Sequence, residues 1–138
     1  MRKILAAVDG SEPALHAART AFELAQAMGA RLTVVYAVPS PFLSIEVPPT
    51  VIDEVIKAEK ARGKTILEGV VKALGSDQIG QLELEGPAAE VIADVAEQQG
   101  YDLIVVGSRG RNALARIILG SIADRLVHIS KTPVLVVK

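Results

Sequence analysis

Two short runs of consecutive apolar residues most constrain how this chain can fold. They occupy residues 4–8 and 103–106, near opposite ends of the sequence. A strand with apolar side chains on both faces is typical of the centre of a parallel sheet that helices cover on either side. The two runs therefore predict an α/β fold in which they are the central strands.

Helical segments alternate with strands along the rest of the chain. Further strands are predicted over residues 32–38, 81–85 and 134–137. Helices are predicted to begin after Ser11, at Thr50, after Pro87 and near Ser121, and the first three to end at Gly29, about Leu74 and near Gly100. Residues 39–49 carry four prolines and are predicted to form a loop.

Strict alternation of strands and helices predicts parallel strands, right-handed crossovers and helices on both faces of the sheet. The expected fold is a single Rossmann-like domain over residues 1–138, with five strands in the flavodoxin-like order 3-2-1-4-5. Residues 81–85 alternate polar and apolar side chains, which suits an edge strand. Such folds bind ligands where the strand order reverses, at the carboxyl ends of strands one and four. Asp9 and Gly107 lie at those ends.

Composition narrows the class of protein. The 138 residues are 50% hydrophobic, enough for one core, and the net charge of −1 and 3% aromatic content argue against a nucleic-acid-binding surface. Cysteine is absent, which excludes disulfides and thiol nucleophiles. The first apolar run is too short for a signal peptide, and no run reaches the roughly 18 residues that span a bilayer. A cytoplasmic protein without a membrane association is therefore expected.

The strand at residues 103–106 leads into a loop with regularly placed glycines. Gly107, Gly110, Gly120 and Ser121 have the spacing G-x2-G-x9-G-S, and the segment between holds Arg109, Arg111 and Arg116 with no acidic residue. Glycine lets a backbone approach a ligand closely, and the amides at a helix start attract anions. The loop thus suits phosphates.

Simpler interpretations of the same residues stay open. The glycines could only turn the chain, and Ser121 could be an ordinary helix N-cap with Asp124 completing a partial capping box. Asp9 could be a turn residue, and the arginines could be solvated loop charges.

Several known site types are absent from the sequence. There is no G-x4-G-K-[ST] of a P-loop enzyme, no G-x-G-x-x-G after the first strand and no G-x-S-x-G elbow. His16 and His128 lie far apart and do not have metal-ligand spacing. No catalytic residue is predicted, and no metal ligand can be named.

The chain closely resembles the universal stress protein family from end to end. The opening ILAAVDGSE, the strand LTVVYAV, the segments DLIVVGSRGR and GSIADRL and the closing TPVLVV follow that family's landmarks in order. The G-x2-G-x9-G-S spacing is the mark of the family's ATP-binding branch.

The resemblance implies a binding site for ATP with Mg²⁺. It implies that Asp9 contacts the adenine, that the backbone near Ala37 faces the base, and that Gly107 and Gly110 lie along the ribose and phosphates. Gly120, Ser121 and Ile122 would hold the phosphates, and Val8 and Arg109 complete the predicted binding set. The resemblance also implies a homodimer through antiparallel pairing of the last strands, Val134–Val137, which would cover an exposed sheet edge.

Three functions follow as hypotheses. The first is an ATP-binding regulatory switch in the stress response. The second is a slow ATPase or autophosphorylating protein in which Asp9, Ser108 or Ser121 takes a chemical role, although the sequence displays no carboxylate cluster to hold the metal. The third is a structural dimer that keeps the motif without binding nucleotide.

Overall fold

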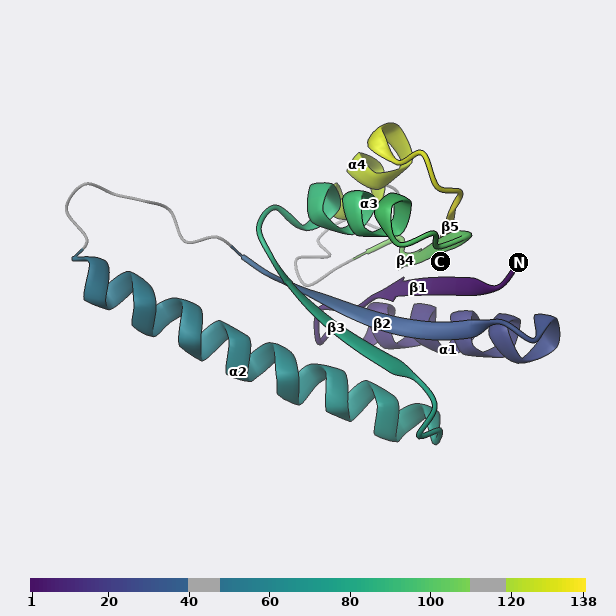
Figure 1. Ribbon diagram of the computed structural model, residues 1–138, viewed down its shortest axis with the longest axis horizontal. Coiled ribbons are helices and arrows are strands. Elements are labelled where there is room, and N and C mark those ends of the chain that lie inside the picture. The colour runs from purple at the N-terminus through teal and green to yellow at the C-terminus, as the bar shows by residue number, and fades with distance from the viewer. Residues whose placement is uncertain (40–47, 110–118) are drawn as a thin grey trace.

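The computed structural model describes residues 1–39, 48–109 and 119–138. A single parallel sheet runs through them in the order β3-β2-β1-β4-β5, as predicted (Figure 1). Its strands are β1 (Lys3–Ala7), β2 (Arg31–Val38), β3 (Gly80–Glu85), β4 (Leu103–Gly107) and β5 (Val134–Val137). The fold is therefore the three-layer α/β arrangement expected from the alternation of strands and helices.

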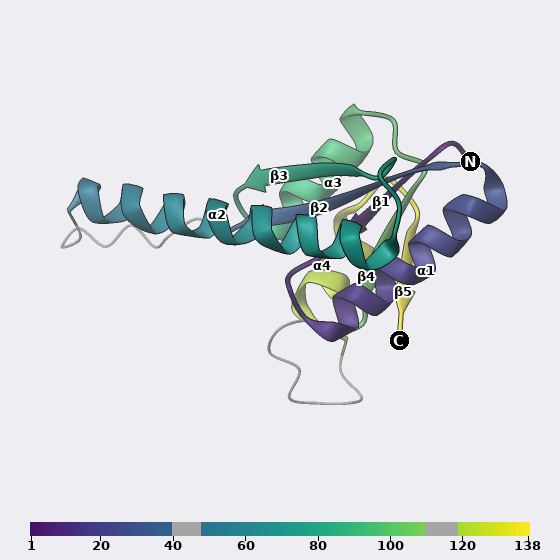
Figure 2. The same ribbon diagram turned by 90° about the horizontal axis from the view of Figure 1, so that it is seen from below.

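Helices cover both faces of the sheet. They are α1 (Glu12–Met28), α2 (Pro49–Leu74), α3 (Ala88–Gln98) and α4 (Ser121–Ile129). Helices α1 and α2 lie on one face, and α3 and α4 lie on the other (Figure 1). The first turns of α2 extend beyond the sheet (Figure 2).

The two central strands supply both cores. Ile4 and Ala6 of β1 are fully buried in the core beneath α1 and α2, whereas Leu5 and Ala7 face the core beneath α3 and α4. Alternate side chains of a strand point to opposite faces, so a strand between two helical layers needs apolar residues at every position. This requirement explains the uninterrupted run near the amino terminus.

Both ends of α1 agree with the sequence prediction. Ser11 is the N-cap, and its hydroxyl oxygen accepts a hydrogen bond from the N–H of Ala14 at 3.3 Å. Gly29 follows the helix in the left-handed conformation, with φ of 64°, where a side chain would be strained.

One predicted element bound needs correction. Pro49 was expected in the loop, but it is the first residue of α2, where a missing N–H costs no helical hydrogen bond. Helix α4 begins at Ser121, as predicted, and Gly120 is its N-cap. The rest of the predicted loop, residues 40–47, lies outside the described residues.

Helix α2 packs unusually close to the sheet at Gly63. A Cβ added there would overlap the side chains of Tyr36 on β2 and Glu83 on β3. The Tyr36 hydroxyl also donates a hydrogen bond to Glu59 of α2 at 3.1 Å. Gly63 therefore sets how near α2 lies to the sheet and which side chains of the helix face inward.

A carboxylate joins the two central strands at their amino ends. Asp102 accepts hydrogen bonds from the backbone N–H groups of Arg2 at 2.7 Å and Lys3 at 2.9 Å. These bonds favour the charged form and lower the pKa of Asp102. The contact lies at the end of the sheet opposite to the predicted site.

Within the described part of the chain, no helix is both long and apolar enough to cross a membrane.

Candidate functional site

The strand order reverses between β1 and β4, and the predicted residues Val8, Asp9 and Gly107 lie at the carboxyl ends of these two strands. The register pairs Ala6 with Val105, two residues before Val8 and Gly107. Val8 is buried, and its N–H donates to the carbonyl of Val35 at 2.9 Å, which holds the end of β1 against β2. Asp9 follows directly and is half-buried at the mouth of the switch point.

Asp9 organises the turn that follows β1. Its Oδ1 accepts hydrogen bonds from the backbone N–H of Ser11 at 2.9 Å and from the Ser11 hydroxyl at 2.5 Å. Gly10 between them has φ of 88°, a conformation that favours glycine. The interpretation of Asp9 as a turn residue is thus correct, and a role in ligand binding would come in addition to it.

Gly107 lies where β4 ends against the first turn of α1. A Cβ added there would lie 3.1 Å from the carbonyl oxygen of Pro13 and 3.2 Å from that of Arg109. Both neighbours are backbone atoms, which cannot move aside as a flexible side chain can. The absence of a side chain therefore keeps the end of β4 close to α1 in the crevice.

The start of α4 is tied to the end of β4 by backbone hydrogen bonds. The N–H of Gly120 donates to the carbonyl of Ser108 at 2.7 Å, and the N–H of Ser108 donates to that of Val137 at 2.8 Å. The amino end of α4, with its oriented amides, is therefore held directly beside the switch point.

The first turn of α4 differs from the simple capping arrangement. The N-cap residue, Gly120, has no side chain to cap the helix, and Ser121 and Ile122 are exposed at its first two positions. The hypothesis of Ser121 as an N-cap with Asp124 in a partial capping box is therefore wrong. An uncapped helix start with an adjacent hydroxyl has the chemistry of an anion site.

The remaining predicted residues are only partly described. Ala37 is half-buried near the end of β2, where the next residue, Val38, accepts a hydrogen bond from the N–H of Gly86 at 3.1 Å. Arg109 is exposed. Gly110, like Arg111 and Arg116, lies outside the described residues.

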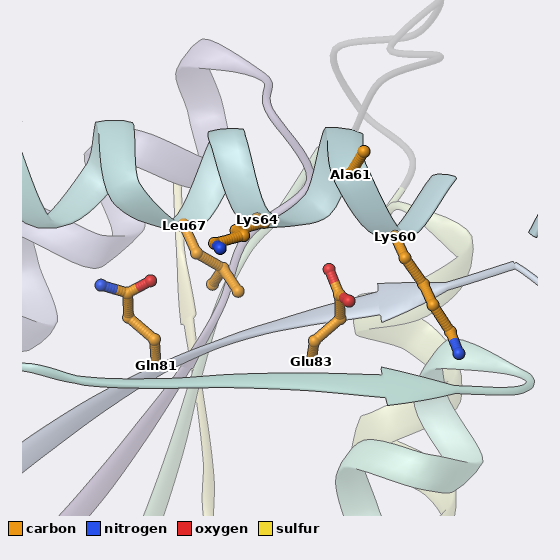
Figure 3. Close-up of a pocket in the computed structure, with 6 residues that line it drawn as sticks. All are labelled: Lys60, Ala61, Lys64, Leu67, Gln81 and Glu83. Carbon is orange, nitrogen blue, oxygen red and sulfur yellow. The ribbon is translucent and has the colours of Figure 1, made fainter. Parts of the chain in front are cut away.

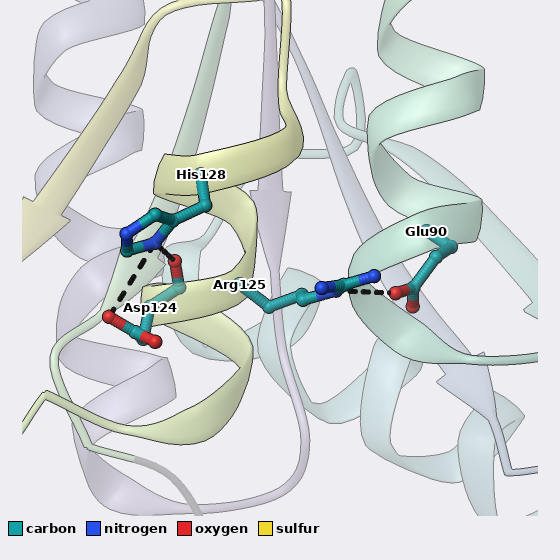
Figure 4. A network of polar contacts seen from close by, with 4 residues as sticks. All are labelled: Glu90, Asp124, Arg125 and His128. Atoms are coloured by element: carbon teal, nitrogen blue, oxygen red, sulfur yellow. Dashed lines mark hydrogen bonds and ion pairs between the residues drawn. The ribbon is translucent and has the colours of Figure 1, made fainter.

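Polar contacts fix α4 on its neighbours (Figure 4). Arg125 Nε lies 2.7 Å from Glu90 Oε1 of α3, and this hydrogen bond lowers the pKa of Glu90. His128 Nδ1 lies 2.7 Å from the backbone carbonyl oxygen of Asp124, one turn earlier. The first contact joins α4 to α3, and the second lies within α4.

A separate open groove of 390 Å³ lies between α2 and the edge strand β3. Figure 3 shows that Gln81 and Glu83 point from β3 towards α2, and that Lys60 reaches back to the strand. Lys60 pairs with Glu85 at the edge of the groove, and this contact raises the pKa of the lysine. The groove lies over the edge of the sheet rather than at the switch point.

The sequence prediction missed that α2 lies against the turn after β1. A Cβ built on Gly10 would lie 3.0 Å from Ile66 Cδ1 and 4.0 Å from Arg62 Nη2. The two side chains are four residues apart, so they share one face of the helix. The four-residue spacing is visible in the sequence. The sequence alone, however, does not show that this face of the helix lies against the turn after β1.

The strand order and the helices on both faces define a doubly wound α/β protein, a class of fold that binds ligands at the switch point of the sheet. The chain matches the universal stress protein family (Usp) over residues 1–138, and it belongs to this family.

Individual relatives extend along the whole chain. A universal stress protein of Methanocaldococcus jannaschii is 35% identical over 140 residues, covering 99% of this chain and 82% of that protein. The solved structure of UspA from Lactobacillus plantarum is 28% identical, with a TM-score of 0.89, and the match covers 99% of this chain and 97% of that one. A universal stress protein solved in complex with cAMP is 28% identical, with a TM-score of 0.74 over 99% of this chain and 97% of that one.

Proposed function

We propose that this protein binds ATP at the switch point of its sheet and acts as a nucleotide-dependent regulatory switch in the stress response. The observation that carries the proposal is that the start of α4 is hydrogen-bonded to the end of β4, the strand that lies beside β1 and its following residue Asp9. A ligand that is polar at both ends and phosphorylated at one of them suits this arrangement.

Each end of the crevice offers different chemistry. The amides at the start of α4 and the hydroxyl of Ser121 suit phosphates, because oriented N–H groups attract anions. The backbone near Ala37 offers hydrogen-bonding groups for the edge of an adenine. Gly107 lies at the end of β4, between the two ends, and we place the ribose alongside it. Val8, Asp9, Arg109, Gly110, Gly120 and Ile122 complete the proposed set.

Mg²⁺ would enter this site with the phosphates. Among the described residues no group of three His, Cys, Asp or Glu side chains is placed to hold a metal ion. Mg²⁺ commonly keeps several waters and binds through substrate phosphates with one or two carboxylates, so such a group is not required.

A solved relative supports a nucleotide as the ligand. The 28% identical universal stress protein was solved in complex with cAMP, which shares its adenosine with ATP. We extend this to an adenine nucleotide in the present chain. We also propose a homodimer paired through Val134–Val137 and a location in the cytoplasm.

Analysis of co-purified nucleotide tests the proposal. The freshly purified protein is denatured, and the released small molecules are identified by chromatography and mass spectrometry. We expect adenine nucleotide in near-stoichiometric amount, or its uptake after incubation with ATP and Mg²⁺. Protein that neither releases nor takes up adenine nucleotide would contradict the proposal.

A further inference from the structure

Arg62 of α2 is an exposed cation placed beside the turn after β1. Its Nη2 lies 4.0 Å from the position that a Cβ on Gly10 would occupy, and it forms no hydrogen bond or ion pair with any described residue. The charged head therefore lies near Gly10, the residue after Asp9, and no structural contact with a described residue holds it.

The packing of α2 determines this placement. Gly63 lets the helix approach Tyr36 and Glu83 closely, which turns the next face of the helix, carrying Arg62 and Ile66, towards the turn after β1. Ile66, one turn further along α2, lies against Gly10 on the same face. The close contact at Gly63 therefore fixes the part of the helix from which Arg62 projects towards this turn.

The position of Arg62 in the crevice indicates which part of a nucleotide it would meet. Helices α2 and α4 lie on opposite faces of the sheet, with the switch point between them (Figure 1). Phosphates bound at the start of α4 leave the base at the other end of the crevice, on the side of β2 and α2. A guanidinium group there can stack on a purine ring, because it is planar, cationic and weakly hydrated.

We propose that Arg62 stacks on the base of the bound nucleotide and so makes α2 part of the site. This inference rests on the proposed function, and it adds a base contact from an element that neither the glycine motif nor the strand ends include. The stacking contact would raise the affinity for the nucleoside portion, whatever the number of phosphates.

Adenosine and ATP distinguish this role from a phosphate contact. Calorimetric titrations of the full chain with each ligand are compared for wild type, Arg62→Gln and Arg62→Lys. If Arg62 stacks on the base, Arg62→Gln should lower the affinity for adenosine and for ATP by the same factor. For a cation over an aromatic ring this factor is about fivefold. Arg62→Lys is expected to recover only part of the loss, because lysine lacks the planar group.

Lys64→Gln is the matched control. Lys64 is an exposed cation on the same helix but lines the groove over β3 (Figure 3), and its removal should leave both affinities unchanged. Equal binding by wild type and Arg62→Gln would overturn the inference, as would a loss confined to ATP or a loss of the same size in Lys64→Gln. If wild type binds neither ligand, the proposed function itself fails.

Discussion

At the scale of single residues, Gly63 and Gly69 of α2 differ in their surroundings although both are helical glycines. A Cβ at Gly63 would overlap Tyr36 and Glu83, whereas a Cβ at Gly69 would meet nothing within 4 Å. A helix with glycine in its middle is less stable than one with alanine there by roughly 1 kcal/mol. The small size of glycine offsets this cost at Gly63, which contacts the sheet, but not at Gly69, which faces solvent.

The two alanine variants should therefore change stability in opposite directions. Gly63→Ala is expected to lower the free energy of unfolding by about 1–3 kcal/mol, because α2 must move away from the sheet. Gly69→Ala is expected to raise it by about 0.5–1 kcal/mol. Urea unfolding followed by circular dichroism measures both, and a Gly63→Ala protein as stable as wild type would contradict the close packing of α2.

At the scale of elements, Asp102 joins the amino ends of β1 and β4 through two backbone N–H donors. Its pKa is lowered in the folded protein, first by the N–H of Arg2 and then by that of Lys3. A carboxyl whose pKa is lower in the folded chain stabilises the fold above its unfolded-state pKa. That contribution is lost as the pH falls through the folded-state pKa.

Replacement of Asp102 by asparagine should thus matter at neutral pH and lose its effect in acid. We expect Asp102→Asn to be less stable than wild type at pH 7, with the difference shrinking below about pH 4, where the carboxyl of the unfolded chain becomes protonated. Urea unfolding at pH 7 and at pH 3 measures the two differences. Asp94→Asn, which removes an exposed carboxylate without hydrogen bonds to described residues, is the control. A difference that stays constant with pH would exclude the proposed role of Asp102.

Element order and type could be predicted from the sequence because each strand and helix carries a local signal. The apolar run of β1, the alternation in β3 and the Ser11 and Gly29 caps of α1 each reflect contacts within the element or with the layer directly above it. The predicted order 3-2-1-4-5 then brought Asp9 and Gly107 to one crevice.

The contacts that the sequence did not reveal are those between distant elements. The role of Gly63 depends on Tyr36 and Glu83, which come from two different strands. The nearness of Arg62 to Gly10 likewise depends on how α2 is rotated, which local periodicity does not determine. Of the two interpretations left open for Ser121, the N-cap is wrong because Gly120 takes that position, and both residue types suit a helix start.

At the scale of the whole molecule, β5 leaves one edge of the sheet without a neighbouring strand among the described residues. Leu135 is 36% exposed on this strand, which is a large value for an apolar residue in a sheet. Edges of this kind are commonly covered by another chain or protected by charge. Pairing of two β5 strands would satisfy the edge and bury the exposed leucine.

A charge at this edge should dissociate the proposed dimer. We expect sedimentation velocity to show a dimer for wild type and a monomer for Leu135→Arg, because like charges would face each other across the paired strands. Val55→Arg alters a residue of α2 that is 46% exposed and should leave the dimer intact. A monomeric wild type, or a dimer that tolerates the arginine, would exclude this interface.

We propose that the start of α4 and the ends of β1 and β4 hold ATP. A substitution at Gly120 tests this proposed site. The φ of −59° and ψ of 151° at Gly120 are accessible to residues with side chains, so valine fits the backbone while crowding the space in front of the helix start. Loss of a good N-cap residue is expected to lower stability by about 1 kcal/mol without ligand.

The deciding measurement is the ATP-dependent gain in thermal stability of wild type and Gly120→Val, each compared with its own ligand-free state. ATP at about 100 times its dissociation constant should stabilise the wild type by about 2.7 kcal/mol, since ligand that binds only the folded state shifts unfolding. Gly120→Val should remain folded and show no gain. A gain in Gly120→Val equal to that of wild type would contradict the site, and no gain in either protein would contradict ATP binding.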